Sequence, residues 1–419
     1  MNGNSLRPCV LLTGATGFLG AQIARRLLKE PGLTVIALVR AENQVEAERR
    51  LERAWWDRGG EVEVLPGDLS LPHLGLDEPS YARLAGRVTH IIHSAADLRV
   101  DAPIEDLRRT NVQGTANLLE LARLVQRDHG LERYAHVSTA YVAGRRNSAI
   151  PEADLSGADG FSNAYEQSKY EAECLVRAAK SELPISVFRP GMIVGAADTG
   201  EIRTFNTVYF PLRLYLSGKL PVIPADPALP VNIVPVDYVA EAVARLTFCP
   251  EAEGLNFHLT APAGSLPKAG ELVEFAREWA RERLGLNLPG PLFLRAPHLS
   301  LRRSGSSEPS MQSTAKRLKQ SPVLPIMGEI ASFQGGKTAR PSTRNDRLKA
   351  LPPTLRGLLT LLPYFNERKQ FQRDNVDRLL GPYPLDWHEF LPRLLAYAVD
   401  QGFLHRTERT VHEQILARL

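Results

Sequence analysis

Residues 9–30, CVLLTGATGFLGAQIARRLLKE, decide the fold, because a strand, a glycine-rich turn and a helix follow one another directly in this stretch. Residues 10–12 are a short apolar run, which is typical of a strand buried inside a parallel sheet. Behind the glycines, Ile23, Leu27 and Leu28 recur at helical spacing. The sequence therefore predicts a βα unit near the start of the chain.

The turn, residues 13–20, spaces its three glycines as GxxGxxG. Gly14 would allow a tight turn, Gly17 would let the backbone approach a pyrophosphate, and Gly20 would let the helix pack closely on the strand. The helix N-terminus would present unpaired N–H groups to the phosphates. An ordinary βα turn could hold the same glycines, but the position directly after an N-terminal strand favours a dinucleotide site. The expected cofactor contacts here are Gly14, Thr16, Gly17, Phe18, Leu19 and Gly20.

Apolar runs alternate with amphipathic helical patterns through the first half of the chain. This alternation predicts βαβ units, and hence an α/β fold with a right-handed, doubly wound parallel sheet of the Rossmann type. Ligands of such sheets bind at the carboxyl ends of the strands. Further strands are predicted at residues 33–40, 61–65, 88–94, 133–138, 185–189 and 255–259, and helices at residues 44–58, 110–126, 162–180 and 236–248.

Arg40 ends the second predicted strand, where NAD-binding folds usually carry an Asp or Glu for the ribose hydroxyls. A guanidinium suits the 2′-phosphate of NADP instead, because it is a permanently charged, bidentate donor. The alternative is an ordinary surface arginine. We expect NADPH or NADP as the cofactor, with NAD less favoured.

Tyr165 and Lys169, in the segment YEQSK, lie one turn apart on the predicted helix 162–180 and share a face. The lysine ammonium would lower the pKa of Tyr165 from about 10 toward working pH, so that Tyr165 acts as a general acid or base. Thr139, at the end of a predicted strand, could donate a hydrogen bond to the same substrate oxygen. YxxxK is frequent by chance and typical of any amphipathic helix, but the three residues together predict a catalytic site.

Taken in order, these motifs resemble the extended short-chain dehydrogenases/reductases over roughly residues 8–262. Four segments narrow the resemblance to the thioester-reductase and fatty acyl-CoA reductase (male sterility) branch. They are LVRA at 38–41, PGDLSLPHLGL at 66–76, HSAADLRV at 93–100 and TNVQGTANLLELA at 110–122. Residues 364–389 resemble the C-terminal domain of fatty acyl-CoA reductases more loosely. The motifs that carry the main resemblance are TGATGFLG at 13–20, Asp68, Asn111, Ser138-Thr139, Tyr165, Lys169 and Arg189-Pro190-Gly191.

The resemblance implies NADPH-dependent reduction of an acyl thioester, either a fatty acyl-CoA or a carrier-bound acyl chain, to the aldehyde, with the alcohol as the product of a second hydride. It implies that Thr139 and Tyr165 bind the carbonyl oxygen, and that Lys169 activates Tyr165 and holds the nicotinamide ribose. It also implies that Asn111 supports the proton path, although Asn111 by itself is only a polar residue near a helix N-terminus. The remaining cofactor contacts that it implies are Asp68, Leu69, Ser94, Ala95, Ala96, Pro190, Gly191, Met192 and Ile193.

Two other functions stay open on the same fold. A nucleotide-sugar epimerase/dehydratase or a hydroxysteroid-type dehydrogenase would use Thr139, Tyr165 and Lys169 equally. Arg40 counts against the epimerase, because such enzymes mostly hold NAD. The long C-terminal region also counts against it. A dinucleotide sensor without turnover is a more distant alternative, against which the intact Thr-Tyr-Lys set argues.

The chain is predicted to divide into three parts. These are a dinucleotide-binding domain at residues 1–290 with substrate-lid elements around 203–230, a basic Ser/Pro-rich connecting segment at 291–350, and a helical C-terminal region at 351–419. The aromatic stretch 204–216 could line an acyl tunnel or simply pack in a core. The basic segment suits solvent, an acidic carrier protein or an anionic membrane. The apolar segment 351–365 leaves peripheral membrane contact open.

Composition removes several other classes of protein. A net charge of +4 is too small to indicate a nucleic-acid partner. The three cysteines lie far apart, without metal-binding spacing, and suit a reducing compartment. There is no signal-peptide pattern at the N-terminus, and no apolar run reaches the ~18 residues that span a bilayer. We expect a cytoplasmic enzyme; its oligomeric state is open.

Overall fold

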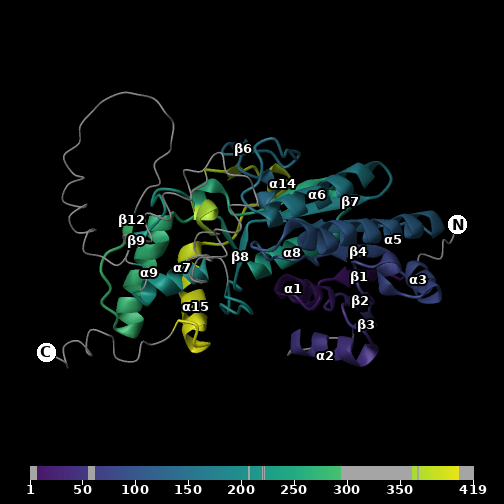
Figure 1. Cartoon of the computed structure of the whole chain (residues 1–419), viewed down its shortest axis with the longest axis horizontal. Coiled ribbons are helices and arrows are strands. Elements are labelled where there is room, and N and C mark those ends of the chain that lie inside the picture. Colours follow the sequence, from purple (N-terminus) through teal and green to yellow (C-terminus); the bar gives the residue numbers. More distant parts are fainter. Residues whose placement is uncertain are drawn as a thin grey trace.

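Seven parallel strands form the central sheet, in the order β11-β7-β5-β4-β1-β2-β3 (Figure 1). The order reverses at β1, which pairs with β2 on one side and β4 on the other. Ligands bind such sheets at the carboxyl ends of the strands beside this switch point. The strands are β1 (Cys9–Thr13), β2 (Thr34–Val39), β3 (Glu63–Pro66), β4 (His90–His93), β5 (Arg133–Val137), β7 (Ile185–Pro190) and β11 (Asn256–Leu259). The computed structural model describes residues 7–54, 62–205, 208–218, 220, 222–293, 361–365 and 368–404.

Apolar side chains alternate between the two faces of the sheet. In β1, Val10 and Leu12 enter one core whereas Leu11 enters the other. Helices α1, α2 and α8 cover the first face, and α3, α5 and α6 cover the second. The helices around the sheet are α1 (Phe18–Leu27), α2 (Gln44–Ala54), α3 (Glu78–Ala85), α4 (Ile104–Arg108), α5 (Gly114–Asp128), α6 (Ala164–Ala178) and α8 (Val236–Thr247).

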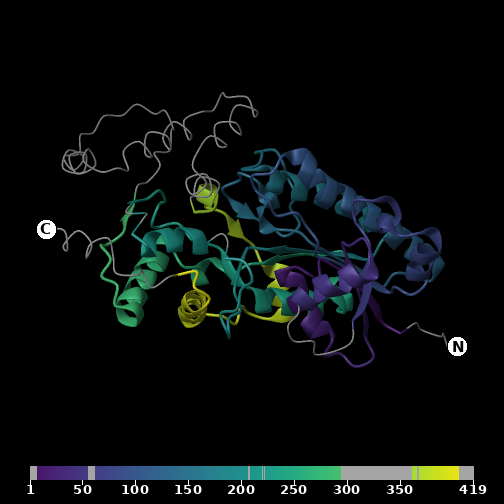
Figure 2. The same cartoon turned by 60° about the horizontal axis from the view of Figure 1, so that its bottom comes forward.

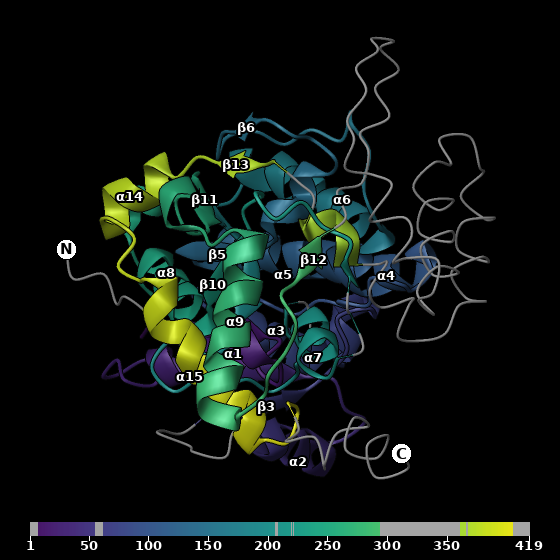
Figure 3. The same ribbon diagram turned by 90° about the vertical axis from the view of Figure 1, so that its left-hand side faces the viewer.

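A third apolar core lies beside the carboxyl ends of the strands and is mainly helical. It joins α7 (Tyr209–Leu216), α9 (Ala269–Leu284) and α15 (Trp387–Asp400), which stand in front of the sheet in Figure 3. Two short parallel pairs border this core. They are β8 (Met192–Val194) with β10 (Ile233–Pro235), and β9 (Val222–Ile223) with β12 (Leu292–Phe293).

The C-terminal part of the chain contacts both regions. β13 (Gln370–Phe371) pairs with β6 (Ala149–Ile150), and α14 (Asp374–Leu380) packs against β11. From there the chain continues into α15, as the yellow ribbon in Figure 2 shows. Short helical turns complete the structure: η1 (Pro72–Gly75), η2 (Arg109–Gln113), η3 (Ala140–Ala143), η4 (Ala179–Ser181), η5 (Pro250–Ala252), η6 (Ala263–Ser265) and η7 (Leu362–Phe365).

The predicted α/β sheet of the Rossmann type is confirmed, but several helices differ from the prediction. The helix expected at 110–126 begins instead with the π-helical turn η2, and α5 follows from Gly114. Helices α3, α4, α7 and α9 were not predicted as helices. Of the basic segment only residues 291–293 are described, and of 351–365 only 361–365, where Leu362 and Tyr364 are buried.

None of the helices in the described ranges is long and apolar enough to cross a membrane. Within the same ranges, no group of three or more His, Cys, Asp and Glu side chains is placed to hold a metal ion. Cys9, Cys174 and Cys249 are free thiols.

Candidate active site

The glycine turn packs so tightly that two of its glycines have no room for a side chain. Gly14 has φ +74°, and a Cβ on it would lie 2.6 Å from the backbone nitrogen of Ala95. A Cβ on Gly20 would lie 2.1 Å from the carbonyl oxygen of Gly14. The N–H of Gly17 donates to that same oxygen at 2.8 Å. Gly20 therefore permits the turn itself to close over the end of β1, rather than only the approach of helix to strand.

The outer side of the turn faces solvent. Thr16 and Gly17 are exposed, and Phe18 and Leu19 are partly buried. Gly17 is the N-cap of α1 and has no side chain to bind the first N–H groups of the helix. Backbone donors at an exposed helix N-terminus, on a turn with room only for glycine, fit the pyrophosphate of a dinucleotide.

Two neighbouring loops complete this edge of the sheet. Ser94, Ala95 and Ala96 follow β4 and are partly buried. Asp68 follows β3, and its carboxylate accepts from the N–H and the hydroxyl of Ser70 at 2.8 and 2.7 Å. Leu69 is held through its carbonyl, which accepts from the Asn117 amide at 2.7 Å. The structure thus brings these predicted cofactor residues to the same edge as the turn.

Arg40 lies directly after β2 and is exposed. Asp97, in the loop after β4, has its pKa lowered mainly by the hydrogen bond from Arg99, and the positive charge of Arg40 adds to this effect. The guanidinium of Arg40 therefore lies close to the same edge of the sheet. Its position allows contact with a ribose phosphate.

Arg203 also reaches the turn, and no sequence pattern identified it. Its guanidinium donates to the carbonyl oxygen of Thr16 at 3.0 Å, from a segment nearly two hundred residues downstream. Burial lowers the pKa of Arg203, and the nearby positive charge of Arg25 lowers it further. A partly desolvated cation at this position would gain from an anionic ligand.

Thr139, Tyr165 and Lys169 come together at the carboxyl end of β5. Thr139 and Lys169 are 5% and 2% exposed, and the Tyr165 ring is partly buried. Burial raises the pKa of Tyr165 well above its ordinary value, and the hydrogen bond from the Thr139 hydroxyl only partly opposes that rise. Tyr165 therefore holds its proton at neutral pH.

The predicted lowering of the Tyr165 pKa by Lys169 is therefore wrong for this structure. The ammonium of Lys169 donates to the carbonyl oxygen of Val137 at 2.9 Å instead. Burial lowers the pKa of Lys169 to about 8, against the attraction of Glu173. Both shifts have one physical cause, because burial disfavours the charged form of each group.

Asn111 lies in the π-helical turn η2 and is 1% exposed. Its amide group donates to the Ser168 hydroxyl at 2.9 Å and to the Asp97 carbonyl at 3.0 Å. Its amide oxygen accepts from the Asp97 N–H at 2.7 Å. Asn111 is thus more than a polar residue at a helix start, because it fixes the loop after β4 to the helix that carries Tyr165.

A chain of buried hydrogen bonds connects Asn111 to the end of β1. The sequence analysis did not predict it. The Thr115 hydroxyl donates to the Asn111 carbonyl at 2.6 Å, and Thr115 lies 3.0 Å from Nε2 of His93. Nδ1 of His93 lies 2.9 Å from the Thr13 hydroxyl, which accepts from the N–H of Ala95 at 3.2 Å. Burial lowers the pKa of His93 to about 3, so the ring is neutral and links the glycine turn to Asn111.

A buried ion pair joins β7 to α6, the helix that carries Tyr165 and Lys169. The guanidinium of Arg189 bonds the carboxylate of Glu173, and both side chains are at most 2% exposed. The Ser138 hydroxyl donates to the same carboxylate at 2.5 Å. Arg189, predicted only as part of a motif, therefore fixes the positions of β5 and α6 relative to β7.

Pro190 and Gly191 follow at the end of β7, with Ile193 partly buried in β8. A Cβ on Gly191 would lie 2.5 Å from the side-chain oxygen of Asn232. That buried oxygen has no hydrogen-bond partner among the described residues. Asn232 lines a cavity of about 400 Å³ together with Lys369 and Phe371. A polar ligand in this cavity could satisfy the Asn232 amide.

The C-terminal segment covers the start of the catalytic helix. The Asn163 side chain caps α6 by accepting from the Glu166 N–H at 3.0 Å, and its amide donates to the Tyr364 hydroxyl at 2.7 Å. The Tyr364 ring meets the Tyr141 ring edge-on, with 4.6 Å between centroids. This packing brings η7 next to the segment that carries Thr139.

The predicted tunnel residues mostly pack in the third core. Within the described part of the chain, that core contains Tyr209, Leu212, Tyr215 and Leu216, and Phe205 packs against it. The Tyr209 hydroxyl accepts from the N–H of Gly195 at 3.0 Å.

The family of the chain follows from comparison with known proteins. A profile described as Male sterility protein matches residues 12–243. The chain is 36% identical over 276 residues to the L-2-aminoadipate reductase large subunit of Penicillium chrysogenum, covering 60% of this chain and 19% of that protein. It is 37% identical over 274 residues to the isonitrile lipopeptide synthase of Mycobacterium tuberculosis, covering 57% and 11%. The chain thus spans less than a fifth of these relatives.

Solved structures of reductase domains share the fold over almost the whole chain. The terminal R domain of the myxalamid PKS-NRPS pathway superposes with a TM-score of 0.73 at 24% identity, covering 97% of this chain and 94% of that one. The reductase domain of a nonribosomal peptide synthetase from Mycobacterium tuberculosis gives 0.65 at 25% identity, covering 95% and 93%. The chain belongs to the male sterility protein family, a group of oxidoreductases within the extended short-chain dehydrogenases/reductases.

Proposed function

We propose that this protein reduces an acyl thioester to an aldehyde with NADPH. The observation that carries the proposal is the hydroxyl pair Thr139–Tyr165, one turn of α6 from the residue Lys169 with its buried ammonium. This group lies at the same edge of the sheet as the glycine turn. A reducible carbonyl held there would meet a proton donor and a bound dinucleotide together.

The chain's own residues account for the proton. Thr139 donates to the Tyr165 oxygen, so the phenolic proton of Tyr165 points to another acceptor. In the proposed complex that acceptor is the thioester carbonyl oxygen, which gains negative charge as the carbonyl carbon is reduced. A tyrosine with a raised pKa is protonated at the start of each turnover, as reduction requires.

NADPH would supply the hydride, held by the glycine turn and by the loops after β2, β3 and β4. Hydride and the Tyr165 proton would convert the thioester to a hemithioacetal. When its C–S bond breaks, the hydroxyl proton would return to Tyr165 and the sulfur would leave as a thiolate, which takes a proton from water. The products are an aldehyde and a free thiol. Lys169 would keep its charge near Tyr165 and the ribose below pH of about 8.

Arg40 supports NADPH rather than NADH as the reductant, and Arg203 supports a dinucleotide at the glycine turn. Arg40 would face the 2′-phosphate, and Arg203 would face the pyrophosphate from across the turn. The thiol partner is proposed to be the phosphopantetheine of a carrier protein or of CoA. Relatives named as nonribosomal peptide synthetases favour the carrier.

The test is NADPH oxidation with acyl-pantetheine thioesters, aldehydes, steroids and nucleotide sugars, with the aldehyde product identified by trapping. We expect turnover with thioesters and its loss in Tyr165→Phe. The matched control is Tyr170→Phe, one residue beyond Lys169 and partly exposed on the same helix, which should keep activity. Turnover with nucleotide sugars or steroids alone would contradict the proposal.

A further inference from the structure

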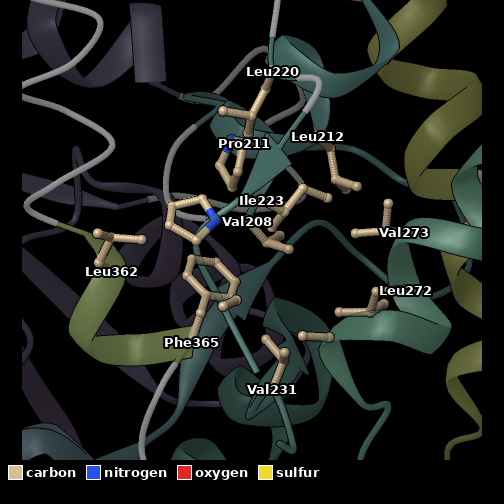
Figure 4. A pocket seen from close by; sticks show the side chains of 13 residues that line it. Val208, Pro211, Leu212, Leu220, Ile223, Val231, Leu272, Val273, Leu362 and Phe365 are labelled. Atoms are coloured by element: carbon tan, nitrogen blue, oxygen red, sulfur yellow. The ribbon is translucent and has the colours of Figure 1, made fainter. Parts of the chain in front are cut away.

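An apolar cavity lies between α7, α9 and η7 (Figure 4). Figure 4 shows Leu362 and Phe365 on one side and Leu272 and Val273 on the other, with Val231 at one end. Among the described residues, every side chain that lines the cavity is apolar. A water molecule inside would find none of the two to four polar partners that it needs.

The size of the cavity limits its occupant. Its volume is about 40 Å³, whereas a single water needs roughly 10–15 Å³. The space therefore accepts a group of a few carbon atoms, such as a short or branched aliphatic chain. A carboxylate or ammonium placed there would lose its hydration without gaining any partner.

Two segments that line the cavity also contact residues near the proposed catalytic and cofactor sites. On one side, η7 contributes Leu362 and Phe365 to the cavity, while Tyr364 between them accepts from the Asn163 amide at the start of α6. On the other, Val231 lines the cavity, and the next residue, Asn232, packs against Gly191 at the end of β7.

The N–H of Ile233 donates to the carbonyl oxygen of Val231 at 2.9 Å, so the chain turns at Asn232. Val231 lines the apolar cavity, and Asn232 lines the larger cavity of about 400 Å³. A ligand whose polar part lies beside Asn232 and Gly191 can place an apolar part beside Val231 and Phe365.

We infer that the apolar cavity binds the aliphatic part of the acyl group and so selects thioesters of short, uncharged acyl chains. This inference rests on the proposed reduction of thioesters and adds the chemical class of the acyl group. It also distinguishes this chain from an enzyme for a charged acyl group, because the lining offers no counter-charge.

The first experiment measures binding without turnover, using the wild-type protein and S-alkyl pantetheine thioethers that cannot be reduced. Each added methylene is expected to tighten binding about fourfold until the cavity is full, and a terminal carboxylate on the longest chain should abolish that gain. Affinities that do not depend on chain length, or that are equal for charged and uncharged chains, would overturn the inference whether or not thioesters are reduced.

The second experiment compares kcat/KM for acetyl, butyryl and hexanoyl thioesters in three variants. Val273→Phe fills the cavity and should lower the preference for butyryl over acetyl at least tenfold, while Leu272→Ala enlarges it and should favour hexanoyl. Leu391→Ala is the matched control, since Leu391 is also 2% exposed in the same core and is not among the residues lining the cavity. An equal change of all three substrates in each variant would contradict the inference, whereas a wild type that reduces no thioester would contradict the proposed function instead.

Discussion

At the scale of single residues, burial raises the pKa of Tyr165 and lowers the pKa of Lys169. Both shifts favour the neutral form of the side chain. The sequence could predict that these two residues lie near Thr139, because helical spacing and strand ends are local properties. It did not reveal their burial, which depends on segments far away in the chain. A raised tyrosine pKa suits a proton donor for reduction better than the phenolate that spacing alone suggested.

The Lys169 shift predicts how activity depends on pH. Its pKa of about 8 lies below the ordinary lysine value of 10.5, so the ammonium is present below pH of about 8 and is lost above it. We expect kcat/KM to be level below pH of about 8 and to fall tenfold per unit above it. The unfolded chain binds the proton up to the higher pKa, so this group makes the folded state more stable as pH rises from about 8 to 10.5. Unfolding through Lys169 therefore does not explain the loss.

Lys180 gives the control for that profile. Burial also lowers its pKa to about 8, but its ammonium donates to Gly254 and Asn256, away from Tyr165. Lys169→Arg should remove the alkaline decline, because a guanidinium keeps its proton, and Lys180→Met should retain it. If the decline disappeared in Lys180→Met and stayed in Lys169→Arg, the titration would belong to Lys180 and the prediction would be wrong.

Arg203 predicts a cofactor effect that no sequence pattern could show. A charged hydrogen bond to a phosphate contributes about 1.5–3 kcal/mol, so Arg203→Met should raise the Kd for NADPH by at least about tenfold. Arg25→Met is the control, because Arg25 lies nearby but faces Glu201 at 3.7 Å. Calorimetric titration of both variants measures the difference, and equal affinities would exclude Arg203 from the cofactor site.

At the scale of elements, the βα units followed from local patterns, because a buried parallel strand and its helix each carry their own periodicity. The π-helical turn η2 did not follow, because it is set by the hydrogen bonds of Asn111 to Asp97 and Ser168. Nor did the pairing of β13 with β6, which joins segments more than two hundred residues apart.

Gly20 tests the geometry of the turn. A Cβ at this position would lie 2.1 Å from the Gly14 oxygen, so Gly20→Ala must open the turn. We expect NADPH binding to be lost while the circular dichroism spectrum stays native. Gly264→Ala, where a Cβ meets nothing within 4 Å, should bind NADPH normally. Normal binding by Gly20→Ala would contradict the proposed location of the pyrophosphate.

At the scale of the whole molecule, one buried carboxylate joins the C-terminal helix α14 to the edge strand β11 of the sheet. Glu152 is 4% exposed and accepts from the N–H groups of His258 and Asn375 at 2.9 and 2.6 Å. His258 lies on β11 and Asn375 on α14. Through this residue the segment that covers the catalytic helix is fixed to the sheet edge. Such long-range contacts have no signature in local sequence.

Removing that carboxylate should destabilise the protein. Glu152→Ala leaves two buried N–H groups without partners, each costing about 1–3 kcal/mol, so we expect a loss of about 2–5 kcal/mol in the free energy of unfolding. Glu132→Ala, at a side chain 59% exposed, should change it by less than about 1 kcal/mol. Urea denaturation measures both, and equal stabilities would show that Glu152 does not hold the two regions together.

The central claim is that a thioester carbonyl accepts a hydride from NADPH beside Tyr165. Its most direct test uses NADPH deuterated at nicotinamide C4, prepared as each of its two stereoisomers, with an acyl-pantetheine thioester and mass spectrometry of the aldehyde. The account predicts one deuterium on the aldehyde carbon from a single stereoisomer, and none from Tyr165→Phe above background. Aldehyde without deuterium from either stereoisomer, or no aldehyde while NADPH is consumed, would contradict it.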